Sequence, residues 1–180
     1  MNDRRARFEA LVMPHLDAAY RLARWLSNSS ADADDIVQDA ILRAYRGFDA
    51  LRAPEAKAWL MVIVRNCHRS TLQRQRRRPT EPLPEEHDVQ DAHAMMASSP
   101  GPEQEAICAD ERDALVRLMF TLPEDHREVL ILRDIEDMSY REIASVINAP
   151  IGTVMSRLAR ARAAIKAQYG HARGQLSAVR

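Results

Sequence analysis

Apolar side chains recur every three or four residues along most of this chain, and no run alternates strictly between apolar and polar residues. The first spacing is typical of amphipathic helices, whereas strict alternation favours strands. Residues 32–46 carry a wide apolar stripe formed by Ile36, Val37, Ala40, Ile41, Ala44 and Tyr45. Glycine is scarce, with 5 in 180 residues, which also favours helices. The pattern therefore predicts an all-α fold.

The helical pattern is interrupted at residues 79–102. This stretch holds prolines near both ends and several acidic side chains, but no Lys or Arg. Such a composition predicts an extended acidic linker. It would join a helical domain at residues 1–78 to a second one at residues 103–170, and residues 171–180 would form a frayed tail.

Residues 139–166 have the pattern of a helix, a sharp turn and a second helix. Ser139 and Glu142 have the spacing of a capping box, which predicts a helix start. Pro150 and Gly152 predict the turn, because proline cannot continue a helix and glycine tolerates positive φ. A second helix is expected from near Thr153, with an inward stripe of Val154, Leu158, Ala161 and Ile165.

No acidic residue lies between Thr153 and Lys166. A basic helix after a capped helix and a turn is typical of a helix-turn-helix that enters the major groove of DNA. By spacing, the candidates for groove contact are Thr153, Ser156, Arg157 and Arg160, and the candidates for phosphate contact are Arg162 and Lys166. The alternative is an amphipathic helix with an ordinary solvated basic face.

Two helices of the first domain also carry candidate surfaces. Within residues 32–46, the side chains of Asp35, Gln38 and Asp39 lie toward the side opposite the apolar stripe. They form either a docking surface for a partner protein or an ordinary solvated face. A helix expected from Pro54 ends in a basic half that could neutralise phosphates. Its candidates for nucleic-acid contact are Trp59, Arg65, Asn66, Arg69, Arg74 and Arg76. Trp59 could stack on an unpaired base, or it could simply belong to the core.

Composition excludes several other classes of protein. The 26 basic and 26 acidic residues balance, so the DNA-binding pattern depends on local segregation of charge. The longest apolar run, residues 58–64, is too short to span a bilayer, and no signal peptide is evident. Cys67 and Cys108 are isolated, which is typical of a reduced, cytoplasmic protein. There is no glycine-rich phosphate loop and no clustered His/Cys spacing, so we expect no enzyme, cofactor or metal.

Together these residues resemble an extracytoplasmic-function (group IV) sigma factor of the bacterial sigma-70 family, from about Phe8 to Tyr169. Residues 32–45 resemble the family's region 2.2, and Ala58-Trp59-Leu60 with Arg65-Asn66 resembles regions 2.3 and 2.4. The family's region 4 has its counterpart in four segments, which resemble it at residues 122–123, 127–129, 140–144 and 152–162.

The resemblance implies a specificity subunit that binds RNA polymerase core and promoter DNA. Asp35, Gln38 and Asp39 would dock on the clamp helices of the β′ subunit, and region 4 would rest on the β flap. The helix that contains Trp59 would engage the −10 element, while the loop at residues 47–53 captures a flipped base. The helix from Thr153 would read the −35 element. An anti-sigma factor that masks the polymerase-binding faces is also implied.

Two departures leave the promoter consensus open. The family often has Asp where this chain has Ser70, and a basic residue is common where it has Met155. The competing interpretation is a conventional helix-turn-helix regulator that binds an operator as a dimer. That protein would need a sensor or dimerisation module in its first half.

Overall fold

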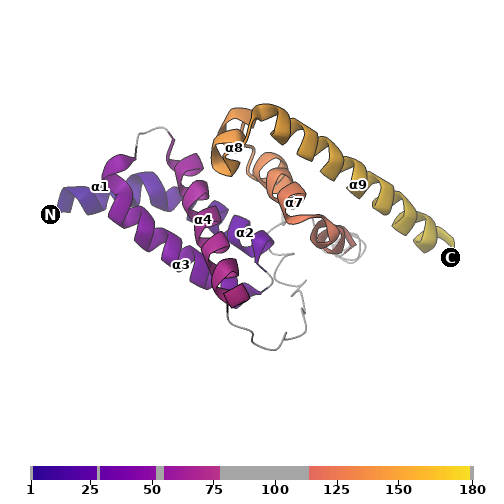
Figure 1. The fold of residues 1–180 in the computed structure, drawn as a ribbon, viewed down its shortest axis with the longest axis horizontal. Coiled ribbons are helices and arrows are strands. Elements are labelled where there is room, and N and C mark those ends of the chain that lie inside the picture. The colour runs from indigo at the N-terminus through magenta and orange to yellow at the C-terminus, as the bar shows by residue number, and fades with distance from the viewer. Residues whose placement is uncertain (1, 28, 52–54, 78–113, 179–180) are drawn as a thin grey trace, which may run out of the picture.

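The computed structural model describes residues 2–27, 29–51, 55–77 and 114–178. Within these ranges all regular secondary structure is helical, which confirms the all-α prediction. The predicted linker at residues 79–102 lies outside the described residues, as do the first residues of the predicted second domain. The chain forms an N-terminal helical unit and a C-terminal helical unit, and the C-terminal unit ends in a long helix that extends away from the rest of the molecule (Figure 1).

The N-terminal unit packs its helices around a core of large apolar side chains. Its elements are α1 (Asn2–Val12), the 3-10 turn η1 (Met13–His15), α2 (Leu16–Leu26), α3 (Ser30–Gly47), the 3-10 turn η2 (Phe48–Ala50) and α4 (Ala56–Arg77). Helices α2, α3 and α4 contact one another, and the side chains buried between them include Leu22, Trp25, Ile36, Leu60, Met61 and Val64. Burial of these side chains is the main favourable contribution to folding of this unit.

Helix α3 begins earlier than its acidic residues indicated. Ser29 is the N-cap, and its side chain accepts a hydrogen bond from the backbone N–H of Asp32 at 3.1 Å. The apolar stripe predicted for this helix is buried at Ile36, Ala40 and Ala44. Tyr45 was wrongly assigned to the buried stripe, since it is 38% exposed at the edge of the unit. Its ring packs edge-on against other aromatic and cationic side chains instead of entering the core.

The C-terminal unit contains the predicted helix-turn-helix. Its elements are a helix at residues 114–121, α7 (Glu124–Leu130), the π-helical turn η3 (Ile131–Ile135), α8 (Tyr140–Ile147) and α9 (Ile151–Ala178). Both hydrogen bonds of the predicted capping box are present: Ser139 N–H donates to the Glu142 carboxylate at 2.7 Å, and Glu142 N–H donates to Ser139 Oγ at 3.3 Å. They fix the start of α8.

The turn between α8 and α9 uses a different residue for its positive φ than the sequence predicted. The residue with positive φ is Asn148, at 51°, where it caps α8 in the left-handed conformation that Asn tolerates. Gly152 is helical, so its conformational freedom is not used here. Helix α9 begins at Ile151 because the carbonyl of Pro150 already accepts the N–H groups of Thr153 and Val154.

Helix α9 presents its predicted stripe inward and is longer than predicted. Val154, Leu158 and Ala161 are buried, and Ile165 is partly buried against the core. The helical backbone continues to Ala178, through residues 171–178 where we expected a frayed tail. No proline lies within α9, so nothing in its backbone forces an end at Gly170.

The two helical units pack directly against each other. Helix α4 contacts α8, and α2 contacts both α7 and η3. Across this contact the ring centroids of Trp25 and Phe120 lie 5.2 Å apart. In Figure 1 α4 lies between α3 and the C-terminal unit, with its first turns nearest to α8. This arrangement determines which candidate residues are exposed.

Candidate nucleic-acid interface

The leading half of α9 presents an exposed surface away from its buried stripe. Gly152, Met155, Ser156, Ala159 and Arg160 are all exposed there. Because the N-terminal residues of a recognition helix are the ones that reach base edges, this is the candidate surface for reading DNA. The surface contains two of the predicted groove residues, Ser156 and Arg160, and neither side chain is part of the core. Thr153, a third, is partly buried at its edge.

Two of the predicted arginines are held by acidic residues of the same unit. Arg157 donates a hydrogen bond to Asp125 at 2.6 Å, and its side chain is only 23% exposed. Arg162 donates to both carboxylate oxygens of Asp134, and this hydrogen bonding raises the pKa of Arg162. Each arginine would have to exchange its carboxylate for a DNA group. Lys166 is exposed and, among the described residues, has no hydrogen-bonded partner.

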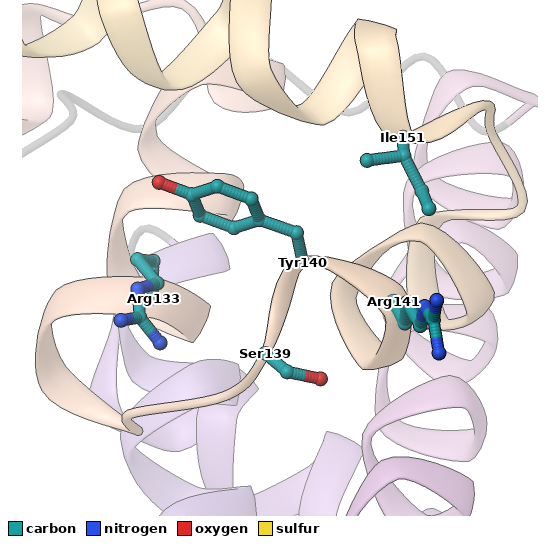
Figure 2. Close-up of a pocket in the computed structure, with 5 residues that line it drawn as sticks. All are labelled: Arg133, Ser139, Tyr140, Arg141 and Ile151. Carbon is teal, nitrogen blue, oxygen red and sulfur yellow. The ribbon is translucent and has the colours of Figure 1, made fainter.

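A surface pocket of about 450 Å³ lies between the start of α8 and the start of α9. Figure 2 shows its lining residues: Arg133, Ser139, Tyr140, Arg141 and Ile151. The guanidinium of Arg133 lies 5.5 Å from the centroid of the Tyr140 ring, on the other side of the Ser139–Tyr140 segment from Arg141 (Figure 2). Two cationic side chains therefore flank the approach to the helix-turn-helix, which suits a polyanion. Sequence reasoning did not identify Arg133 or Arg141 because each is a single charge outside a basic run.

The basic half of α4 provides a second cationic surface. Asn66, Arg69, Arg74 and Arg76 are all exposed on it. Arg74 is oriented by hydrogen bonds to the Ser70 carbonyl and to the Thr71 hydroxyl, both within its own helix. These residues are exposed to solvent, and their contact with nucleic acid stays a prediction.

Trp59 lies at the opposite end of α4 and is partly buried. It packs against the core, and a Cβ added at Gly47 would lie 3.8 Å from its ring. The ring therefore supports the junction between α3 and α4 while one part of it faces solvent. Phe48, in the loop predicted to capture a base, is buried. Residues 52 and 53 of that loop lie outside the described ranges.

Arg65 occupies the contact between the two helical units. Its side chain is buried and donates a hydrogen bond to Glu128 of α7 at 2.6 Å. Burial raises the pKa of Glu128, and Arg65 opposes that rise. One helical turn away, His68 Nε2 lies 3.3 Å from Glu124 Oε1, and the neighbouring imidazole lowers the pKa of Glu124. In this arrangement Arg65 is unavailable to DNA, so a role at the −10 element stays a prediction.

A second ion-pair cluster joins the units around Glu136. Arg21 donates to both of its carboxylate oxygens, at 2.6 and 3.1 Å, and the Lys57 ammonium lies 3.0 Å from the same carboxylate. Burial by itself would raise the pKa of Glu136, but Arg21 and Lys57 together lower it. Glu136 therefore remains charged and is held by residues from two different helices of the N-terminal unit.

The predicted docking face on α3 lies on the opposite side of that helix from its buried stripe. Asp35 and Gln38 are exposed, and Asp39 forms an ion pair with Arg43 at 2.8 Å. Sequence reasoning missed Leu42, which is 53% exposed on this face. Its spacing of four residues from Gln38 was the signal that could have placed it there.

Neither cysteine chemistry nor metal binding is supported within the described residues. Cys67 is buried, and burial raises the pKa of its thiol to about 11, which leaves little reactive thiolate at neutral pH. Cys108 lies outside the described ranges. Among the residues described, no three His, Cys, Asp or Glu side chains are grouped as a metal site would require. None of the helices in the described ranges combines the length and the apolar composition that a bilayer span requires.

Comparison with known proteins decides the family. Residues 11–78 match the family described as Sigma-70 region 2, and residues 112–165 match Sigma-70, region 4. The ECF RNA polymerase sigma-E factor of Escherichia coli K12 is 37% identical over 144 residues, which cover 76% of this chain and 73% of that protein. The chain belongs to the extracytoplasmic-function sigma factors. The SigE factor of Mycolicibacterium smegmatis is 34% identical over 157 residues, which are 86% of this chain but only 58% of that relative.

Two solved structures share the fold. The sigma factor RpoE, crystallised with the anti-sigma factor NepR from Bartonella quintana, matches 93% of this chain with a TM-score of 0.67 at 24% identity. CnrH, solved in complex with the cytosolic domain of CnrY, matches 91% with a TM-score of 0.62 at 25% identity. The N-terminal unit thus corresponds to sigma region 2 and the C-terminal unit to sigma region 4.

Proposed function

We propose that this chain is an alternative sigma factor that binds RNA polymerase core and directs promoter-specific initiation of transcription. The observation that carries the proposal is the presence of regions 2 and 4 in one chain, each exposing a basic helix. Two modest DNA contacts on one body strengthen each other, because the second contact forms at a high effective concentration. The chain supplies promoter recognition, and we expect the catalysis to reside in the polymerase.

Region 4 would bind the −35 element through α9. Ser156 and Arg160 are exposed at the leading end of this helix, with Thr153 at its edge. Arg160 is the candidate for a bidentate contact to guanine, since its guanidinium has no acidic partner among the described residues. Arg141, exposed beside the pocket, would hold a flanking phosphate, and Arg133 would first exchange its contacts with Asp137 and the Met138 carbonyl. Those contacts position the helix without reading sequence.

Region 2 would engage the −10 element through α4. Separating the strands costs on the order of 1–2 kcal/mol for each base-pair step. Stacking of an unpaired base on an aromatic ring returns roughly 1–3 kcal/mol, and Trp59 presents a partly exposed ring for this purpose. The exposed Arg69, Arg74 and Arg76 would bind the phosphates of the opened strand.

The polymerase-docking face would be the exposed side of α3. Asp35, Gln38 and Asp39 supply polar contacts, and Leu42 adds an apolar contact beside them. This face lies away from the contact between the two units, so it stays accessible in the packed arrangement (Figure 1). An anti-sigma factor is the expected inhibitor, because the similar solved sigma factor RpoE is bound to one.

Transcription with purified components tests the proposal. Core polymerase would be incubated with and without this chain on a library of genomic fragments, and the start sites would be mapped. We expect discrete start sites that depend on the chain and share two upstream elements. Absence of both core binding and chain-dependent start sites would refute the proposal. Specific binding to an operator by the chain alone, with no effect on core polymerase, would favour the helix-turn-helix regulator instead.

A further inference from the structure

The leading edge of α9 exposes large apolar side chains where a DNA-reading helix usually carries polar ones. Met155 is 53% exposed, and Ile151, one turn earlier, is 41% exposed. The neighbouring exposed residues are small: Gly152, where an added Cβ would meet nothing within 4 Å, and Ala159. Nothing bulky on α9 therefore shields Met155 from a surface that approaches this helix.

Two of the arginines on the first half of α9 are held by acidic side chains, whereas Arg160 is exposed without an acidic partner among the described residues. Arg157 is turned toward α7 by its 2.6 Å hydrogen bond with Asp125, and Arg162 is held by Asp134. Ser156 donates its hydroxyl to the Thr153 carbonyl at 3.0 Å, within the same helix. In the first two turns of α9, Met155 is therefore the longest side chain that projects outward without a polar partner among the described residues.

An exposed methionine in the major groove has one complementary group. The groove edges of adenine, guanine and cytosine present hydrogen-bond donors and acceptors, whereas thymine also presents its C5-methyl group. Methionine offers only an apolar, flexible side chain with a weakly accepting sulfur, so it cannot pair with guanine as an arginine does. A thymine methyl is therefore the base group that the methionine side chain can cover without leaving a polar group of the base unpaired.

We propose that Met155 is a specificity-determining residue that packs on the C5-methyl of a thymine in the −35 element. This inference rests on the proposed function, in which α9 reads that element. A protein partner on the Ile151–Met155 edge is the competing occupant. DNA is favoured because this edge is continuous with Ser156 and Arg160, and because no acidic residue lies anywhere from Ile151 to Tyr169. The nearby cationic side chains attract a polyanion.

Removal of single methyl groups from the promoter tests the contact. Holoenzyme would be assembled from core and the full chain, and its affinity would be measured on promoters in which each −35 thymine, on either strand, is replaced by deoxyuridine. Wild-type holoenzyme should lose affinity roughly three- to five-fold at one position, as expected for one buried methyl group. Met155→Ala should abolish that loss at the same position and leave the responses at other positions unchanged.

A matched control and a gain-of-preference variant complete the test. Met13→Ala removes another exposed methionine, in η1, and should keep the wild-type response to deoxyuridine. Met155→Arg should shift selection from a randomised −35 library away from thymine and toward guanine at that position.

Three outcomes would overturn the proposal. They are a −35 element without thymine, a wild-type holoenzyme indifferent to every methyl removal, and a deoxyuridine effect that persists in Met155→Ala. Loss of core affinity in Met155→Ala, measured without DNA and with an unchanged deoxyuridine response, would assign the edge to a protein partner. Failure of the proposed function is distinguishable, since wild-type holoenzyme would then select no promoter at all.

Discussion

At the scale of single residues, the partners of each arginine decide what it can contribute to DNA binding. Arg160 is exposed with no acidic partner among the described residues, whereas Arg157 is engaged with Asp125. DNA contact by Arg157 must first break a charged hydrogen bond, so part of the gain is offset. Two arginines three residues apart on one helix are therefore expected to differ in their contribution.

Replacement of Arg160 with Ala should weaken holoenzyme binding to the −35 element by roughly 1–3 kcal/mol, the value of a good bidentate base contact. Arg157→Ala should cost less in DNA affinity, because Asp125 already occupies its guanidinium. Binding titrations on one promoter at fixed salt concentration compare the two variants. An equal or larger loss for Arg157→Ala would contradict this ranking.

The docking face on α3 is also tested residue by residue. Asp35→Lys should lower the affinity for core polymerase more than Asp39→Lys does, because Asp39 is already paired with Arg43. Reversal of charge at the exposed Asp17 of α2 is the matched control and should leave core affinity unchanged. Fluorescence titration of labelled core measures all three. Unaltered core binding in Asp35→Lys would exclude α3 as the docking face.

At the scale of elements, sequence predicts well what short-range geometry determines. The capping box and the inward stripe of α9 were predictable because their partners lie three or four residues apart. The pairing of Arg65 with Glu128 was not, because these residues are 63 positions apart and their meeting depends on how two units pack. Asn148 was missed as the turn residue because Gly152 is the commoner signal for positive φ.

The capping box makes a prediction for the stability of the helix-turn-helix. Ser139→Ala should lower the free energy of unfolding by about 0.5–2 kcal/mol, whereas Ser145→Ala, at an exposed position within α8, should not lower it. Urea denaturation of the full chain provides both values. A loss at Ser145 as large as that at Ser139 would show that the cap is not the cause.

The same cap has a pH dependence with a definite sign. The hydrogen bond with Ser139 lowers the pKa of Glu142, so its contribution to stability is present above the ordinary pKa of a glutamate and is lost as the pH falls through the lowered one. Glu142→Gln should therefore destabilise the chain at neutral pH, and the difference from wild type should shrink in acid. A difference that grows as the pH falls would contradict this assignment.

At the scale of the whole molecule, the contact between regions 2 and 4 depends on buried charges. A buried ion pair contributes little net stability compared with an apolar contact, but removal of one partner costs roughly 3–5 kcal/mol. The Arg65–Glu128 pair is of this kind, with both side chains buried. Contact between Arg65 and promoter DNA would require the two units to separate and both charges to be rehydrated.

Glu136→Gln should loosen the packed arrangement, because Arg21 and Lys57 would lose their shared carboxylate. Small-angle scattering of the free chain should give a larger radius of gyration, while Glu9→Gln, at an exposed pair within α1, should not change it. The pKa of Glu136 is lowered, so the wild-type chain should also expand as the pH falls through that lowered pKa. The radius of the Glu136→Gln variant should change less over the same fall in pH. An unchanged radius in Glu136→Gln would show that this cluster does not hold the units together.

The π-helical turn Ile131–Ile135 lies directly before Glu136, whose carboxylate pairs with both Arg21 and Lys57. Its wider hydrogen bonding, from Glu136 N–H to the Ile131 carbonyl, accommodates one more residue than an α-helical turn would. Five residues at this wider pitch turn through nearly the same angle as four α-helical residues at about 100° each, so deletion of one residue that restored α-helical geometry would leave Glu136 directed toward Arg21 and Lys57. The wide turn thus absorbs one extra residue while the ion pairs that join the two units keep their geometry.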